Sequence, residues 1–128
     1  MKNALVWGAA GGIGQAILQK LNADGWTTIA VARDTSTITT LADHEFETPF
    51  DDPDRLEQTA YLISQEAGDI DFCCYTAGDI LQTRVSDMLP QDWNRIISAN
   101  LTNAYYAIHF SLPLLSENAH LIFVGAVR

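Results

Sequence analysis

The segment Trp7-Gly8-Ala9-Ala10-Gly11-Gly12-Ile13-Gly14 decides how this chain folds, because the pattern of apolar residues changes there. Residues 4–7 form a short apolar run, which is typical of a buried strand. After the glycines, Ile13, Ile17 and Leu21 recur at helical spacing, and Gly25 follows where a helix needs a left-handed cap. The segment therefore predicts a strand, a glycine turn and a helix.

Glycines in such a turn suit a bound phosphate. Without side chains they let the backbone turn sharply, and they let a pyrophosphate approach the helix N-terminus, where free N–H groups and the helix dipole favour negative charge. The loop differs from G-x-G-x-x-G and lacks the Gly-Lys-Ser/Thr ending of loops that bind ATP or GTP. Taken alone, the loop is equally compatible with a turn that serves only packing.

The rest of the chain alternates between strand-like and helix-like patterns. Strands are predicted at residues 26–32, 45–50, 70–75 and 121–124, and a helical turn at residues 38–42. Asp52 and Pro53 predict the start of a helix. Its apolar stripe consists of Leu56, Ala60, Ile63 and Ala67.

A long helix is predicted to begin near Pro90 or Asp92. Its apolar face is predicted to carry Trp93, Ile97, Ala104 and Ile108. Asn100 lies on the same stripe, which is unexpected for an amide side chain and calls for a buried partner or a water molecule.

Strands that alternate with helices predict an α/β fold: a doubly wound, open parallel sheet of about five strands with helices on both faces. The ligand of such a sheet belongs at the carboxyl ends of its strands. The length of 128 residues suits one domain spanning residues 1–128.

The composition and charge of the chain limit the classes of partner that it can bind. The chain is 48% hydrophobic and has a net charge of −9, which predicts a folded protein that binds neither nucleic acid nor an anionic membrane. Cys73 and Cys74 are adjacent in an apolar run and are expected to be buried thiols. With no signal-like N-terminus and no apolar run long enough to cross a bilayer, we expect a cytoplasmic protein.

Read as G-x-x-x-G-x-G through Gly8, Gly12 and Gly14, the loop resembles the cofactor loop of the short-chain dehydrogenase/reductase family. The spacing G-x-x-G-x-x-G, through Gly8, Gly11 and Gly14, also fits and is similar to that of the family's extended branch. Three later segments favour the shorter oxidoreductase branch and occur in the family's order: Asp51, Tyr75-Thr76-Ala77-Gly78 and Asn100-Leu101.

The resemblance implies a Rossmann-like fold and a set of site residues. The loop residues Gly8, Gly12, Ile13 and Gly14 would hold the dinucleotide. Asp51 would contact adenine, Ala77 and Gly78 would lie against the ribose, and Asn100 would support the water relay of the catalytic site. The plainer alternatives are a loop carboxylate, a strand-ending turn and a hydrogen-bonded core amide. No metal site is expected.

The chain also departs from the family pattern. Trp7 and Thr76 stand where relatives usually carry Thr and Asn, which puts the hydrogen bonding of the loop in question. Ala126 or a neighbour occupies the place of the catalytic serine. None of the tyrosines is followed four residues later by lysine, so the Y-x-x-x-K pair is missing. The resemblance therefore implies a truncated, inactive form whose proton-transfer groups are absent.

The residues after the second predicted strand bear on the choice of cofactor. The order is Ala32-Arg33-Asp34, and an arginine at this place pairs with the 2'-phosphate of NADP, whereas a carboxylate accepts the ribose hydroxyls of NAD. Arg33 therefore favours NADP. Asp34 keeps NAD as the alternative.

Three functions remain open from the sequence. The first is an NADP-dependent oxidoreductase that acts on a small carbonyl or alcohol. The second is a dinucleotide-binding sensor without catalytic activity. The third is an interaction module, because the fifth predicted strand would be an apolar sheet edge. We expect a homo-oligomer.

Overall fold

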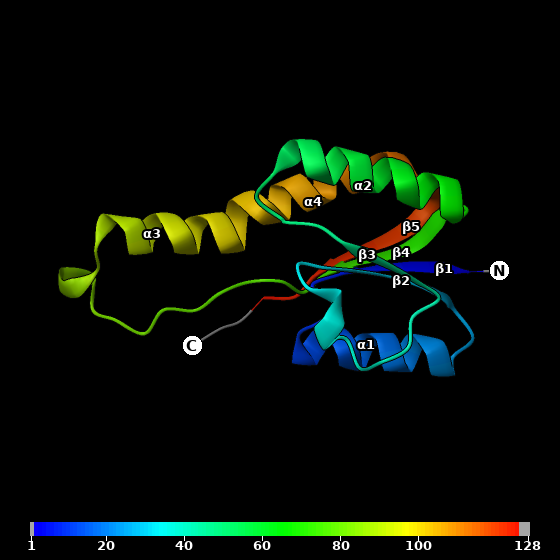
Figure 1. Ribbon diagram of the computed structural model, residues 1–128, viewed down its shortest axis with the longest axis horizontal. Coiled ribbons are helices and arrows are strands. Elements are labelled where there is room, and N and C mark those ends of the chain that lie inside the picture. The colour runs from blue at the N-terminus through cyan, green and yellow to red at the C-terminus, as the bar shows by residue number, and fades with distance from the viewer. Residues whose placement is uncertain (1, 126–128) are drawn as a thin grey trace.

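In the computed structural model, which describes residues 2–125, one parallel sheet has the strand order β3-β2-β1-β4-β5 (Figure 1). The strands are Asn3–Trp7 (β1), Thr27–Ala32 (β2), His44–Glu47 (β3), Ile70–Tyr75 (β4) and Leu115–Phe123 (β5). This order reverses direction between β1 and β4, as in doubly wound dinucleotide-binding folds. The predicted fold class is confirmed.

Helices cover both faces of the sheet. The α-helices are Gly12–Ala23 (α1), Pro53–Glu66 (α2), Pro90–Ile97 (α3) and Asn103–Ser111 (α4). Short 3-10 helices occur at Thr35–Thr37 (η1), Val85–Asp87 (η2) and Leu112–Leu114 (η4), and a π-helical turn at Ser98–Thr102 (η3) joins α3 to α4. Helix α1 lies on one face, α2 and α4 lie on the other, and α3 extends beyond the sheet (Figure 1).

The central strand β1 divides the core between the two faces. Leu5 and Trp7 are fully buried in the cluster that packs against α2 and α4, whereas Val6 belongs to a smaller cluster with Leu18 of α1. Because a central parallel strand is covered on both sides, all its residues from Ala4 to Trp7 are buried. Burial on both faces of the sheet explains why residues 4–7 form a continuous apolar run in the sequence.

Helix α2 confirms its prediction. The side chain of Asp52 accepts hydrogen bonds from the backbone N–H groups of Asp54 and Arg55, and Pro53 is the first helical residue. The stripe through Leu56 and Ile63 is buried against the sheet. The capping residues and the helical spacing of the apolar side chains were sufficient to predict this helix.

Helix α1 forms where it was predicted, and Ile17 and Leu21 of its predicted apolar stripe pack against the core cluster that contains Leu18. Gly14 and Leu18 are its buried residues, whereas Ile13 is 56% exposed. Gly25 ends the helix with φ +83°, and the N–H of Trp26 donates to the carbonyl of Leu21, which is the expected left-handed cap.

Four predicted boundaries were wrong. The helical turn lies at Thr35–Thr37 rather than at residues 38–42, because the Asp34 side chain caps it by accepting from Ser36 N–H. Strand β3 ends three residues earlier than predicted, at Glu47, and β5 begins six residues earlier, at Leu115. The long helix is interrupted by η3, and Trp93, expected on its buried face, is 57% exposed.

Two further properties concern the described residues only. No helix within residues 2–125 is long and apolar enough to cross a membrane. Within the same range, no group of three or more histidine, cysteine or acidic side chains is arranged to hold a metal ion.

Cys73 and Cys74 are free and buried, as predicted. Burial raises the pKa of the Cys73 thiol to about 11, from an ordinary value of 9.0. The unfolded chain therefore loses this proton at lower pH than the folded protein does, so the contribution to stability is complete below pH 9.0 and is lost as the pH rises to about 11.

We expect the free energy of unfolding to fall across this pH range, with Cys73 accounting for about 2–3 kcal/mol of the decrease. Urea denaturation of the wild type and of Cys73→Ala at intervals from pH 8 to pH 11 measures it. The variant should start from a lower stability but lose less of it with pH. Parallel curves for the two proteins would show that the buried thiol is not the cause.

Candidate functional site

Two adjoining cavities open at the carboxyl ends of the strands. The first, of about 430 Å³, lies over the glycine loop and is called the loop cavity. The second, of about 440 Å³, reaches from the sheet to α3 and is called the polar cavity. Both are lined by Arg33, Phe50, Ala77 and Gly78, so they form one continuous cleft across the point where the strand order reverses. This is where open α/β sheets bind ligands.

The glycine loop owes its shape to close backbone packing. Gly8 has φ +82°, and its N–H donates to the carbonyl of Val31 at 2.9 Å. A Cβ on Gly8 would lie 2.6 Å from the backbone nitrogen of Ala77, and one on Gly14 would lie 2.3 Å from the carbonyl oxygen of Gly8. A Cβ on Gly12 would meet nothing within 4 Å. Gly8 and Gly14 are therefore required by the fold, while Gly12 leaves open space.

Thr76 ties the loop to the neighbouring strand end. Its backbone N–H and its hydroxyl both donate to the carbonyl of Trp7, at 2.9 and 2.7 Å, and the hydroxyl also lies 3.1 Å from the carbonyl oxygen of Gly8. The loop therefore keeps a side-chain anchor despite the departure from the family pattern at this position.

The side chain of Trp7 is anchored on the face of the sheet that α2 and α4 cover. Its indole N–H donates to the hydroxyl of Ser111 at 2.9 Å, and this hydroxyl donates to the carbonyl of Ala107 at 2.6 Å. The ring packs edge-on against Phe50, with centroids 5.6 Å apart. Because Phe50 lines both cavities, the buried tryptophan supports the wall of the cleft.

Arg33 and Asp34 have different surroundings. Arg33 is exposed, lines both cavities, and forms no salt bridge with any of residues 2–125. The carboxylate of Asp34 accepts from the hydroxyl and the backbone N–H of Ser36, at 2.6 and 3.0 Å, and these bonds lower its pKa. Both residues line the loop cavity, but one carboxylate oxygen of Asp34 is already engaged by its own turn, whereas the guanidinium of Arg33 is not paired with a carboxylate of the described residues.

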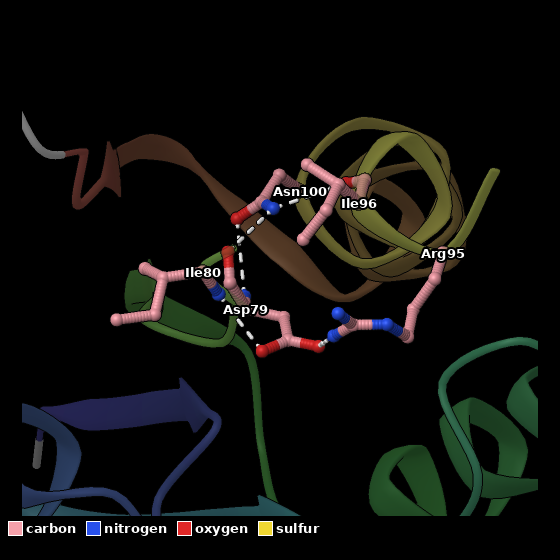
Figure 2. A network of polar contacts seen from close by, with 5 residues as sticks. All are labelled: Asp79, Ile80, Arg95, Ile96 and Asn100. Carbon is pink, nitrogen blue, oxygen red and sulfur yellow. Dashed lines mark hydrogen bonds and ion pairs between the residues drawn. The ribbon is translucent and has the colours of Figure 1, made fainter. Parts of the chain in front are cut away.

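Asn100 is held by the loop that follows β4 (Figure 2). Its amide oxygen accepts from Asp79 N–H at 3.2 Å, and its amide nitrogen donates to the carbonyls of Asp79 and Ile96 at 2.8 and 3.0 Å. A salt bridge between Arg95 and Asp79 closes the network from α3. The side chain is exposed, so the prediction of a core-facing amide was wrong. Its partners are backbone groups of Asp79, in the loop after β4, and of Ile96, in the last turn of α3, and Asn100 itself lies in the π-helical turn that follows α3.

A third cavity, of about 640 Å³, lies between this loop, α4 and the end of β5. It is lined by Asn100 and by apolar side chains that include Ile80, Leu81 and Phe123. Tyr75 also lines it, and burial raises the pKa of its hydroxyl to about 12, so the phenol stays protonated at neutral pH. Ala126, expected at the place of the catalytic serine, lies outside the described residues.

The structure brings most of the predicted site residues together. Asp51 is exposed and lines the polar cavity with Arg33, while Ala77 and Gly78 join the two parts of the cleft. Gly12, Ile13 and Gly14 lie at the N-terminus of α1 and line none of the cavities described above. Asn100 lines the third cavity rather than the cleft.

Sequence reasoning missed several residues of the cleft. Phe50, Arg95 and Asn103 line the polar cavity, and Thr76 lines the loop cavity. Asn103 offered one signal, since it is a second amide within an otherwise apolar helical segment. No comparable signal marked Phe50, Arg95 and Thr76, because they reach the cleft only when segments far apart in the sequence pack together.

Comparison with known proteins gives a consistent result. The sequence model of the family described as short chain dehydrogenase matches residues 2–128. An uncharacterized oxidoreductase of Staphylococcus aureus is 24% identical over 135 residues, which cover 98% of this chain and 58% of that protein. One of Staphylococcus epidermidis is 25% identical with the same coverage. The chain thus spans less than two thirds of the length of these relatives.

Solved structures of dehydrogenases have the same fold as this chain. The aldohexose dehydrogenase of Thermoplasma acidophilum, in ligand-free form, superposes with a TM-score of 0.86 at 27% identity, over 95% of this chain and 48% of that chain. A glucose/ribitol dehydrogenase of the short-chain type from Brucella melitensis gives 0.85 at 26% identity, over 95% and 55%.

Proposed function

Because the chain belongs to the short-chain dehydrogenase family, we propose that residues 1–128 form a single dinucleotide-binding domain that takes a nicotinamide dinucleotide in the cleft. The observation that carries the proposal is the glycine loop. Its backbone packs so closely at Gly8 and Gly14 that no side chain is tolerated, while the space beside Gly12 stays open. A bound pyrophosphate needs this combination of a fixed loop and free access to the N-terminus of α1.

The residues around the cleft fit the two halves of such a cofactor. Arg33 and Asp51, in the polar cavity, suit the adenosine half. Asn100 and the third cavity suit the nicotinamide half and a small carbonyl or alcohol substrate. When bound, the nicotinamide would supply or accept the hydride of an oxidoreductase reaction. The chain's own residues would bind and orient the cofactor.

The choice of NADP over NAD follows from charge. Arg33 lacks a salt-bridge partner among residues 2–125, so its guanidinium is available for a 2'-phosphate. Asp34, the residue that would favour NAD, is engaged by Ser36. The positive charge of Arg33 would also offset some of the repulsion between a 2'-phosphate and the net charge of −9.

Arg33→Ala is expected to weaken NADPH binding by about 10- to 100-fold, because one charge-assisted contact to the phosphate is lost. NADH binding should change by less than about threefold, since NADH has no 2'-phosphate for the arginine to contact. Titration of the purified protein with each cofactor, followed by quenching of tryptophan fluorescence, measures both constants. Arg84→Ala removes the same charge outside the cleft and should leave both unchanged. Equal losses for the two cofactors in Arg33→Ala would contradict the assignment to NADP.

We propose further that residues 1–128 bind the cofactor without catalysing hydride transfer. None of the tyrosines at positions 61, 75, 105 and 106 is followed four residues later by lysine. Tyr75, the tyrosine that lines the cleft, has a raised pKa that suits a structural hydroxyl better than a general base.

The second candidate function is self-association without a role in catalysis. Leu121, Ile122 and Phe123 of the edge strand β5 are 36%, 46% and 52% exposed, an apolar surface that suits another protein chain. The cofactor titration separates the candidates. A folded protein that binds neither cofactor, and that forms dimers or larger species by analytical ultracentrifugation, would support the second.

A further inference from the structure

The polar cavity holds more polar groups than Arg33 and Asp51. On its far wall, Asn103 begins helix α4 immediately after the π-helical turn, and Ala99 of that turn also lines the cavity. Phe50, 4% exposed, and Tyr75, 2% exposed, supply apolar surface between them. Flat apolar surface edged by hydrogen-bonding groups is suited to a planar heterocycle.

The amide oxygen of Asn103 is buried, and within residues 2–125 it accepts no hydrogen bond. It is the only buried side-chain oxygen or nitrogen of the described residues in this condition. A buried acceptor without a donor costs stability, and such groups in folded proteins usually have a functional partner. Asn103 therefore needs a donor from outside the described chain.

The charges of the cavity limit what this donor can be. Arg95 is paired with Asp79, which leaves the Arg33 guanidinium and the Asp51 carboxylate as the free charges of the cavity lining. Since Arg33 is the proposed partner of the 2'-phosphate, Asp51 is the remaining free charge, and its carboxylate favours a group that donates hydrogen bonds over a second anion. In the adenosine half of the dinucleotide, which the proposed contact of Arg33 with the 2'-phosphate assigns to this cavity, the neutral and planar N–H donor is the exocyclic amine of adenine.

We propose that Asn103 is a specificity-determining residue that reads the adenine base of the dinucleotide by accepting a hydrogen bond from its exocyclic amine. The inference rests on the proposed function and deepens it, because it names the group that selects the base. Asp51 supplies a second acceptor at the open side of the same cavity. A base with a carbonyl in place of the amine would present an acceptor to Asn103, and two acceptors repel.

The binding test compares NADPH with its hypoxanthine analogue, in which a carbonyl replaces the amine. The wild type should bind NADPH at least about tenfold more tightly than the analogue, as expected for one well-placed hydrogen bond to a base edge. In Asn103→Leu, which is similar in size but has no acceptor, the preference should fall below about threefold. A variant that keeps the full wild-type preference would overturn the inference.

A second readout distinguishes base reading from a structural role. Without nucleotide, Asn103→Leu should raise the melting temperature by about 4 °C, because the unpaired acceptor is removed. Asn94→Leu makes the same exchange at an exposed helical position and controls for helix propensity, so its rise should be smaller. If Asn103→Leu instead lowers the melting temperature and Asn103→Ala does so too, the amide is a structural group and the inference fails.

The outcomes also separate this inference from the proposed function. A wild-type protein that binds NADPH and its analogue equally well would refute base reading by Asn103 and leave dinucleotide binding intact. A folded wild type that binds neither would refute the proposed function itself, and with it this inference.

Discussion

Gly14→Ala is expected to lower the free energy of unfolding by about 3 kcal/mol and the melting temperature by about 10 °C. Its Cβ would lie 2.3 Å from the carbonyl oxygen of Gly8 and 2.9 Å from the Cα of Ala9. Both are backbone atoms, so no side-chain rotation relieves the overlap. Alanine is favoured over glycine within a helix by about 1 kcal/mol, which is too little to compensate. Differential scanning calorimetry measures the loss of stability.

The same substitution should abolish cofactor binding at accessible concentrations, a loss of at least about 100-fold. The carbonyl of Gly8 accepts from Gly11 N–H at 3.2 Å, so displacing it would disturb the loop that faces the pyrophosphate. Titration with NADPH at a temperature where the variant is folded measures this effect without interference from unfolding.

Gly12→Ala is the matched control. A Cβ there meets nothing within 4 Å, and it lies in the first turn of the same helix. Its stability should be unchanged or slightly higher, by helix propensity alone. If the two variants prove equally stable, the close approach of Gly14 to Gly8 does not constrain the fold.

Trp7→Ala is expected to cost about 3–5 kcal/mol, a large part of the stability of a protein of this size. The side chain is fully buried at the centre of the sheet, where it packs against Phe50 and donates to Ser111. Its removal leaves a cavity beneath the wall of the cleft, so cofactor binding should weaken as well. Urea denaturation followed by circular dichroism measures the loss.

Two further substitutions separate packing from hydrogen bonding. Trp7→Phe keeps most of the buried apolar surface and loses the indole N–H, so it should cost only about 1 kcal/mol beyond the reduction in volume. Trp26→Ala removes a tryptophan that is only partly buried, against Phe72 and Lys2, and should cost much less than Trp7→Ala. Comparable losses at positions 7 and 26 would mean that the tryptophan of β1 has no special role.

Predictions from the sequence succeeded where the signal was local. The Asp52 cap, Pro53 and the stripe of α2 lie within about four turns of one helix, and Gly25 ends α1 within one turn. They failed where a distant partner decides exposure. Trp93 was predicted on a buried face by spacing alone, yet α3 extends beyond the sheet and leaves it without a surface to pack on.

The same contrast holds for the site. The positions of Arg33, Asp51 and Ala77 after successive strands were sufficient to predict that they meet, because parallel strands end at one edge of the sheet. The contacts that fix the site are different. Thr76 lies 69 residues from Trp7, Ser111 lies 104 residues from it, and Asn100 lies 21 residues from Asp79.

The sequence by itself determined the order of strands and helices, the glycine turn, and the edge of the sheet where a ligand belongs, because periodicity, caps and turns are properties of neighbouring residues. Only the tertiary structure decided which polar groups find partners. Among the described residues, it left Arg33 facing the cleft without a salt-bridge partner and buried the Asn103 acceptor without a donor. Whether a polar group is satisfied depends on atoms far away in the sequence, and no local pattern records them.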